Sequence, residues 1–581
     1  MDVGTALAGV RTIKSAFLVL VALALTGYKW PVHKPLNDSV TCDYIVVGAG
    51  TAGSIVANRL SEDPRLAVCV IEAGGDPPLE TEIPSLFAYL PKTYMDWNFT
   101  SEDDGYTAQY RQQTFLDLPQ GKLLGGSSSI HHLYHIRGDP KDYDDWATAT
   151  GDDSWSWQNL LPYFIKSERV EDPYILNSQS GKYHGSNGYM GITRESRDLP
   201  LRYLKAFKEM GHKIIENANA GETLGFFRPM ITIFGGVRQS SAESFLSPIK
   251  NRENLYIMKN TLVTKILIDE NSQATGVQCT TSDGTAITIL AQREVIVSAG
   301  AFNTPKLLML SGIGPKDHLE SFGISVVSDL PVGENLQDHM GVILVHKLEE
   351  TSEILTSDPT QFPVPTFVGF GAINKTQSNP DYITLNLISR NIPAVLMQLC
   401  SSVFSLHEDV CAEIYSTGEG REVLFTVLSL GRPSSRGQIR LQSANPEDPP
   451  KIYTGFLSAI IDLEKNVDSI LDFIRVTESS YFTGVGGQTK YFDFPNCREA
   501  TTAREYWKCY VLHMMDTTFH YSATCPMGTV LDSSLKVVGV SKLRVVDASA
   551  LPNLTSGTIN AAVMVLAEKA ADIIKRSQSC E

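Results

Sequence analysis

One strand–turn–helix segment limits the fold of this chain more than any other part of the sequence. The apolar, β-branched run 44–47 leads into Gly48-Ala49-Gly50-Thr51-Ala52-Gly53 and then into a helical pattern that ends near residue 60. Gly48 permits a tight turn, Gly50 lets the backbone approach a pyrophosphate, and Gly53 lets the helix pack closely on the strand. A second apolar run, 67–71, ends in Glu72, where an acidic side chain accepts hydrogen bonds from an adenosine ribose. The segment therefore predicts a βαβ unit that binds a dinucleotide, with Thr51 and Ala52 at the helix N-terminus facing the anion.

The alternative is a glycine turn with only a structural role, but this alternative gives no function to Glu72 at the strand end. The glycine pattern alone does not separate NAD from FAD. A later segment, PQGKLLGGSSSI at 119–130, does so, because its small and hydroxyl residues can bring backbone amides close to a bulky planar cofactor.

Four blocks in order resemble the glucose-methanol-choline (GMC) flavoprotein oxidoreductases. They are the glycine turn, GKLLGGSS at 121–128, GAFNTPKLLMLSGIG at 300–314 and TFHYSATCPMG at 518–528. The resemblance implies FAD bound without a covalent link, because Ile130 stands where some relatives carry a flavin-linked histidine. Beyond the glycine turn, it implies further cofactor contacts from Leu124, Gly125, Gly126, Ser128, His131, Val263, Asp547, Ala548 and Asn560.

Oxidation of an alcohol needs a hydride acceptor and a base that removes the hydroxyl proton. Flavin N5 supplies the first, and the family motif around His520 points to this histidine as the base. Relatives carry a second histidine or asparagine where this chain has Thr558, which can form one hydrogen bond but cannot act as a base. His520 is therefore expected to work alone, with Thr558 beside the substrate. His339, in PVGENLQDH at 331–339, is predicted to stabilise a loop rather than to act in catalysis.

Three histidines, His131, His132 and His135, fall within five residues. A helical pattern would place His131 and His135 on one face, but no Asp, Glu or Cys partner is evident nearby, so no metal site is predicted. Contact between His131 and the flavin edge is the preferred interpretation.

The expected fold class is α/β, with a Rossmann-like FAD-binding domain interleaved with an α+β substrate domain built on an antiparallel sheet. The FAD-binding domain is predicted over 40–154, 236–341 and 480–581, and the substrate domain over 155–235 and 342–479. Within the second domain, Phe226, Phe227, Phe367 and Phe370 are candidates for a pocket that binds a rigid apolar alcohol, although core packing is an equal alternative.

The N-terminal segment differs from the rest of the chain. Arg11 and Lys14 precede the uncharged run SAFLVLVALALTG, which predicts a cleaved signal peptide over 1–27 and a secreted protein, with a membrane anchor as the alternative. Secretion permits disulfides among the nine cysteines, and Cys400 with Cys411 and Cys497 with Cys509 are the most closely spaced pairs. Asn37, Asn98, Asn374 and Asn553 fit the pattern of glycan acceptors, but a glycan on Asn553 would crowd the active site.

The net charge of −16 disfavours binding to nucleic acid, and no membrane contact is expected of the mature protein. The chain resembles secreted insect members of the family that oxidise ecdysteroids or glucose. Thr558 favours a bulky alcohol such as an ecdysteroid, because a sugar would suffer more from the loss of a hydrogen-bonding side chain. Either O₂ or a quinone could accept the electrons. The other classes considered are a nicotinamide dehydrogenase and a flavin-binding lyase or carrier without redox activity.

Overall fold

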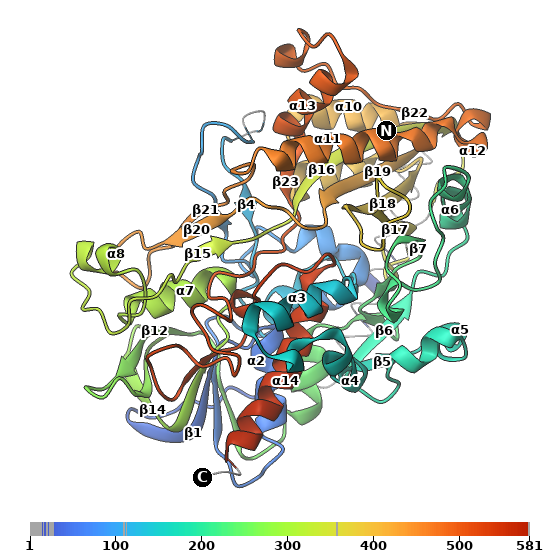
Figure 1. The fold of residues 1–581 in the computed structure, drawn as a ribbon. Coiled ribbons are helices and arrows are strands. Elements are labelled where there is room, and N and C mark those ends of the chain that lie inside the picture. Colours follow the sequence, from blue (N-terminus) through green and yellow to red (C-terminus); the bar gives the residue numbers. More distant parts are fainter. Residues whose placement is uncertain are drawn as a thin grey trace.

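Two seven-stranded sheets organise the protein, and Figure 1 shows them in different parts of the molecule. The computed structural model describes residues 28–578 except 109, 110, 112, 356 and 357, together with residues 14, 17, 18 and 21. The predicted signal peptide otherwise lies outside the described residues. Within this described part, no helix combines the length and apolar character needed to cross a bilayer.

The first sheet has the strand order β11-β2-β1-β14-β13-β12, and β24 pairs with β14. Strands β11, β2, β1, β14 and β24 run parallel, whereas β12 and β13 form antiparallel pairs that extend the sheet. This is the predicted Rossmann-like sheet. Its strands are β1 (Val40–Val47), β2 (Val68–Ile71), β11 (Leu255–Met258), β12 (Thr261–Ile268), β13 (Ala274–Thr281), β14 (Ala286–Val297) and β24 (Leu543–Val545).

The glycine turn joins β1 to α2 (Thr51–Leu60), as the sequence predicts. Gly48 has a φ of +96°, and a Cβ at this residue would lie 2.5 Å from the carbonyl oxygen of Ser298. A Cβ at Gly53 would lie only 1.9 Å from the carbonyl oxygen of Gly48. The helix therefore approaches the turn so closely that no side chain fits at Gly53.

Several helices cover the first sheet or prolong its strands. Helix α2 packs on the long C-terminal helix α14, which in turn contacts α4, and α7 follows β14 directly. The bounds are α3 (Pro140–Thr150), α4 (Trp157–Ser167), α7 (Gly300–Leu310) and α14 (Ile559–Gln578).

The second sheet is antiparallel, with the order β22-β16-β19-β18-β17-β7 and with β23 paired to β16. Helices α10, α11 and α13 pack on it (Figure 1). Its strands are β7 (Gly225–Phe227), β16 (Met340–Glu350), β17 (Thr366–Gly371), β18 (Tyr382–Arg390), β19 (Arg421–Leu430), β22 (Gln488–Thr489) and β23 (Met515–Thr517). The helices are α6 (Leu199–Glu209), α9 (Pro393–Gln398), α10 (Glu408–Gly418), α11 (Ile461–Phe473), α12 (Ser480–Gly484) and α13 (Ala503–Met514).

This sheet draws strands from both predicted domains. Strands β22 and β23 lie in the segment 480–581, which the sequence assigns to the FAD-binding domain, yet both pair with β16. The segment 480–581 therefore contributes strands to both sheets, since β24 belongs to the first sheet. The predicted domain limits stay predictions.

Shorter strands and helices make up the rest of the chain. The antiparallel set β15, β20 and β21 lies beside α7 in Figure 1. The remaining strands and helices are β3 (Phe99–Thr100), β4 (Asp117–Leu118), β5 (Glu168–Val170), β6 (Met190–Arg194), β8 (Met230–Ile231), β9 (Ile233–Phe234), β10 (Val237–Arg238), β15 (Glu334–Leu336), β20 (Gly437–Arg440), β21 (Lys451–Tyr453), α5 (Pro173–Leu176) and α8 (Lys316–Ser321).

The four phenylalanines for which the sequence leaves a substrate pocket and core packing as equal alternatives belong to the core. Phe226 stacks on Phe207 with ring centroids 4.0 Å apart, and Phe227 stacks on Phe370 at 5.8 Å. Phe367 packs against Tyr203. All four are buried and none lines the large cavity described below, because their strands turn these rings toward the helices and neighbouring strands of the second sheet.

Three disulfides link described cysteines. Cys400–Cys411 and Cys497–Cys509 are the two pairs that the sequence spacing singles out, and their Cα atoms are 5.5 and 5.6 Å apart. A third bond, Cys42–Cys69, joins the neighbouring strands β1 and β2 and was not predicted.

The Cys400–Cys411 bond closes a short loop between α9 and α10. Replacing both cysteines by serine should lower the free energy of unfolding by roughly 3 kcal/mol, because the unfolded chain regains the entropy of an open loop. Denaturant unfolding of oxidised wild type and variant measures this loss. Equal stabilities would show that the bond does not constrain the unfolded protein.

Candidate active site

One cavity extends from the glycine turn after β1 to Leu385 on strand β18 of the second sheet. Segments far apart in the sequence meet along its wall, as expected if they share one ligand. The predicted cofactor and catalytic residues that line it are Gly48, Gly50, Thr51, Ala52, Glu72, Gly126, Ser128, His131, Val263, His520, Asp547, Ala548, Thr558 and Asn560.

Three of the predicted cofactor residues, Gly53, Leu124 and Gly125, do not line the cavity. Gly53 lies against the backbone of the turn, and the Leu124 side chain is fully buried in the core. Gly125 has a φ of +86° and begins the turn that brings Gly126 to the cavity. These residues therefore shape the wall without forming its surface.

The carboxylate of Glu72 lies at one end of the cavity beside the glycine turn. Its Oε2 accepts a hydrogen bond from the Ala49 backbone N–H at 2.7 Å, and Oε1 accepts one from Gly74 at 2.8 Å. Burial raises the pKa of this carboxyl, while the two backbone donors act in the opposite direction. The side chain is thus fixed at the strand end where a ribose would meet it.

The C-terminal residues close the other side of the same region. Asp547 accepts hydrogen bonds from the Gly300 N–H and the Thr304 hydroxyl, which tie β24 to the start of α7. The Thr51 hydroxyl donates to Asn560 Oδ1 at 3.1 Å, so the N-termini of α2 and α14 meet at the cavity. Two helix N-termini therefore present backbone N–H groups to one ligand.

Buried polar atoms along the wall lack partners among the described residues. They are Gln120 Oε1, His131 Nε2 and Asn303 Nδ2, and all three residues line the cavity. A Cβ at Gly126 would lie 2.8 Å from the Cα of Gly50, so the two glycine turns face each other across a gap that side chains would fill. Leaving buried polar atoms without partners lowers the stability of the folded protein. The three unpartnered atoms and the two facing glycine turns therefore fit a long ligand with polar edges and a flat ring, such as FAD.

His520 lies half-buried in the cavity wall near the second sheet. Its Nδ1 lies 2.9 Å from His339 Nδ1 and 3.0 Å from the Thr518 hydroxyl. Its backbone N–H donates to Asp338 Oδ1 at 2.8 Å, which fixes the position of the residue. Burial raises the pKa of Asp338 to about 7.

The neighbours of His339 determine which nitrogen of His520 carries the proton. His339 Nε2 lies 3.2 Å from the Gly431 carbonyl oxygen, which only accepts, so this nitrogen bears the hydrogen. In neutral His339 the Nδ1 atom must then accept, and His520 Nδ1–H is the donor. The lone pair of His520 is left on Nε2, away from these partners, where it can receive a proton from a ligand.

The sequence predicted His339 only as a loop-stabilising residue and did not indicate that it orients the ring of His520. The two histidines are 181 residues apart, and nothing in their spacing indicates contact. The position of His339 at the end of the PVGENLQDH motif, directly before β16, was the one signal available.

Burial lowers the pKa of His520 well below its usual value near 6.5, and the neighbouring histidines His339, His132 and His131 lower it further. A base must be unprotonated to act, so activity should be lost only as the pH falls through this low pKa. The rate of flavin reduction at saturating alcohol should therefore stay constant from about pH 8 down to about pH 6.5 and decline only in more acidic solution. Stopped-flow measurements across this range test the expectation, and a decline centred above about pH 7 would contradict it.

Thr558 lines the cavity, but its hydroxyl lies 3.4 Å from the carbonyl oxygens of both Tyr134 and Ile136. Since a carbonyl oxygen only accepts, the hydroxyl hydrogen of Thr558 points toward the backbone. The side chain therefore gives the cavity little donor capacity.

The histidine-rich segment is irregular rather than helical, which corrects the predicted geometry. His135 bonds to Glu168, a partner that the sequence did not reveal, and Glu168 also pairs with Arg137 and His184. His131 Nδ1 accepts from the buried guanidinium of Arg238 at 3.0 Å. Burial beside this cation lowers the pKa of His131 to about 3, so its ring is neutral in the cavity wall.

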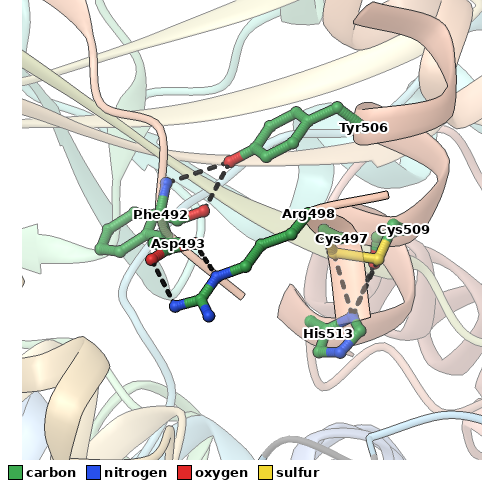
Figure 2. The surroundings of a disulfide bond; sticks show 7 residues. All are labelled: Phe492, Asp493, Cys497, Arg498, Tyr506, Cys509 and His513. Atoms are coloured by element: carbon green, nitrogen blue, oxygen red, sulfur yellow. Dashed lines mark hydrogen bonds and ion pairs between the residues drawn. A yellow bond between two sulfur atoms is a disulfide. The ribbon is translucent and has the colours of Figure 1, made fainter. Parts of the chain in front are cut away.

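Cys497, Cys509 and His513 form another group with the atoms of a metal site, lying within 4.8 Å of one another. Figure 2 shows that the two sulfurs form a disulfide and that the His513 ring lies beside it. His513 Nδ1 lies 2.8 Å from the Cys509 carbonyl oxygen and donates to it. Neither thiolate is available, so this group supports the fold of α13 and does not ligate a metal.

Comparisons with known proteins agree with this arrangement. Two family models described as GMC oxidoreductase match residues 42–341 and 433–567. Ecdysone oxidase of Bombyx mori is 38% identical over 574 residues, covering 96% of this chain and 85% of the relative. Glucose dehydrogenase [FAD, quinone] of Drosophila melanogaster is 33% identical, covering 92% and 87%. The structure of formate oxidase from Aspergillus oryzae superposes with a TM-score of 0.81 at 28% identity, covering 94% of this chain and all of that one.

Proposed function

Since the chain belongs to the GMC oxidoreductase family, and is a FAD-dependent enzyme acting on CH–OH donors, we propose that its substrate is an ecdysteroid or a similarly bulky alcohol. When bound, FAD accepts the hydride of the carbinol carbon. The His520 Nε2 atom takes the hydroxyl proton as the C–O bond becomes a carbonyl. An alcohol and an electron acceptor are therefore the two partners of this site, as is usual in the family.

The apolar character of the cavity near His520 carries the substrate proposal. Leu133, Tyr134, Leu385 and Phe519 line it, and the Tyr134 hydroxyl is already paired with Thr366 at 2.6 Å. A steroid ring system can cover these surfaces with apolar atoms, whereas a sugar would leave several hydroxyls without partners.

Similarity to glucose dehydrogenase makes glucose the second candidate. The experiment is a comparison of kcat/KM for ecdysone and for glucose, each with O₂ and with a quinone as acceptor. We expect ecdysone to be preferred by at least about tenfold, since each unpaired buried hydroxyl costs about 1 kcal/mol or more. Preference for glucose would reject the ecdysteroid proposal and leave the oxidoreductase chemistry intact.

The FAD is proposed to be bound without a covalent link. Ile130 has no nucleophilic atom, and the ring of His131 is held by Arg238. Acid precipitation of the holoenzyme should release all of the flavin into the supernatant. Yellow colour that stays with the precipitate would show a covalent bond.

We further propose that the protein is secreted. The predicted leader over 1–27 and the three disulfides support an oxidising compartment, and Asn37, Asn98 and Asn374 are exposed where a glycan could attach. Expression in insect cells, with N-terminal sequencing and glycosidase treatment of protein from the medium, tests this. Retention of the uncleaved chain in the cells would contradict it.

A further inference from the structure

His132 presents an imidazole to the cavity and has no hydrogen-bond partner among the described residues. Its ring packs edge-on against Phe87 and Phe519, with centroids 4.7 and 5.5 Å apart. Neither ring nitrogen forms a hydrogen bond with a described residue, so both are left for another group. Burial lowers the pKa of His132 to about 4, so the ring is neutral and carries one donor and one acceptor.

His132 and His520 serve the same part of the cavity. Both line it, and Phe519, which contacts His132, is the residue directly before His520.

Three hydroxyl groups in this region are already engaged, whereas His131 Nε2 has no partner among the described residues and belongs to the ring predicted to contact the flavin edge. The Thr558 hydroxyl points to backbone carbonyls, the Thr518 hydroxyl lies 3.2 Å from the His339 carbonyl oxygen, and the Tyr134 hydroxyl pairs with Thr366. A substrate hydroxyl that donates to His520 still needs a donor for its oxygen. This need grows as the oxygen gains negative charge on losing its proton.

We propose that the His132 ring N–H donates this hydrogen bond to the substrate oxygen, making His132 a second catalytic residue beside His520. The inference rests on the oxidation of an alcohol at this site and not on which alcohol is used. His132 would then supply the donor that Thr558 does not, because the Thr558 hydroxyl hydrogen points to backbone carbonyl oxygens.

The variant His132→Phe tests the proposal, because it keeps an aromatic ring between Phe87 and Phe519 and removes only the nitrogens. Flavin reduction by ecdysone should slow by about 10²-fold, since one donor to a developing oxyanion is lost. The ketone product, measured by equilibrium dialysis with the holoenzyme, should bind about tenfold more weakly.

A matched control is His346→Phe. His346 is buried in the second sheet against Phe473 and Phe482 and does not line the cavity. Neither of its ring nitrogens has a partner among the residues that the structure describes. This variant should keep the wild-type rate and ketone affinity, with flavin content confirming that both variants fold.

Two further variants separate a donor from a packing role. His132→Gln retains an N–H donor and should keep the rate within about tenfold of wild type. Adding T558N to His132→Phe should restore at least about tenfold of the lost rate, because it supplies a donor from the neighbouring wall. Equal losses in His132→Phe and His132→Gln, or a wild-type rate in His132→Phe, would overturn the proposal. If ecdysone fails to reduce the wild-type flavin but another alcohol succeeds, the substrate proposal has failed, and the same comparison with that alcohol still decides the role of His132.

Discussion

Replacing His520 by alanine is expected to slow flavin reduction by an alcohol by about 10² to 10⁴, while FAD stays bound. The loss follows from the geometry around the ring. His339 and Thr518 occupy Nδ1 of His520, which leaves the Nε2 lone pair as the proton acceptor in the cavity. Anaerobic stopped-flow absorbance near ~450 nm, where oxidised flavin absorbs, measures the rate.

A matched variant, His339→Ala, retains the base but removes the partner that fixes its tautomer. It should slow reduction by a smaller factor, roughly tenfold, because Thr518 still accepts from Nδ1. A wild-type rate in His520→Ala would show that another group removes the proton. A larger loss in His339→Ala than in His520→Ala would reverse the assignment of base and positioning residue.

The change Gly53→Ala should abolish FAD binding and lower the free energy of unfolding by about 3 kcal/mol. The new Cβ would lie 1.9 Å from the Gly48 carbonyl oxygen and 3.3 Å from the Ser298 Cβ. The first clash is with backbone, which cannot move aside without displacing α2 from β1. The ratio of flavin to protein after purification, together with the thermal midpoint, measures both effects.

Gly484→Ala is the control for this prediction. Gly484 ends α12, and a Cβ there would have no atom within 4 Å, so this change should leave both flavin content and stability unaltered. Normal flavin content in Gly53→Ala would mean that the helix can shift without losing the cofactor, contrary to the packing described for the turn.

The local motifs were sufficient to predict the cofactor half of the molecule. The pattern from residue 44 to Glu72 fixes a strand, a tight turn, a helix and a second strand by short-range constraints alone. Segments near 126, 300 and 547 then meet in one cavity because they share a ligand. The resemblance to a family supplied that shared ligand.

Features that depend on distant pairing could not be predicted. The contact of His339 with His520, the bond of His135 to Glu168 and the Cys42–Cys69 disulfide all require knowledge of which strands and loops become neighbours. The choice between pocket and core for the four phenylalanines stayed open for a related reason. Hydrophobicity alone does not tell which side of a sheet faces a cavity and which faces the core.

The most direct test of the account mixes the oxidised enzyme anaerobically with ecdysone and with ecdysone deuterated at the reacting carbinol carbon. We expect the flavin to bleach without any nicotinamide cofactor, and deuterium to slow bleaching several-fold because the C–H bond breaks in this step. In His520→Ala, bleaching should be at least about 10²-fold slower. Failure of ecdysone and of every other alcohol tested to bleach the flavin, or bleaching that is equally fast in His520→Ala, would contradict the account.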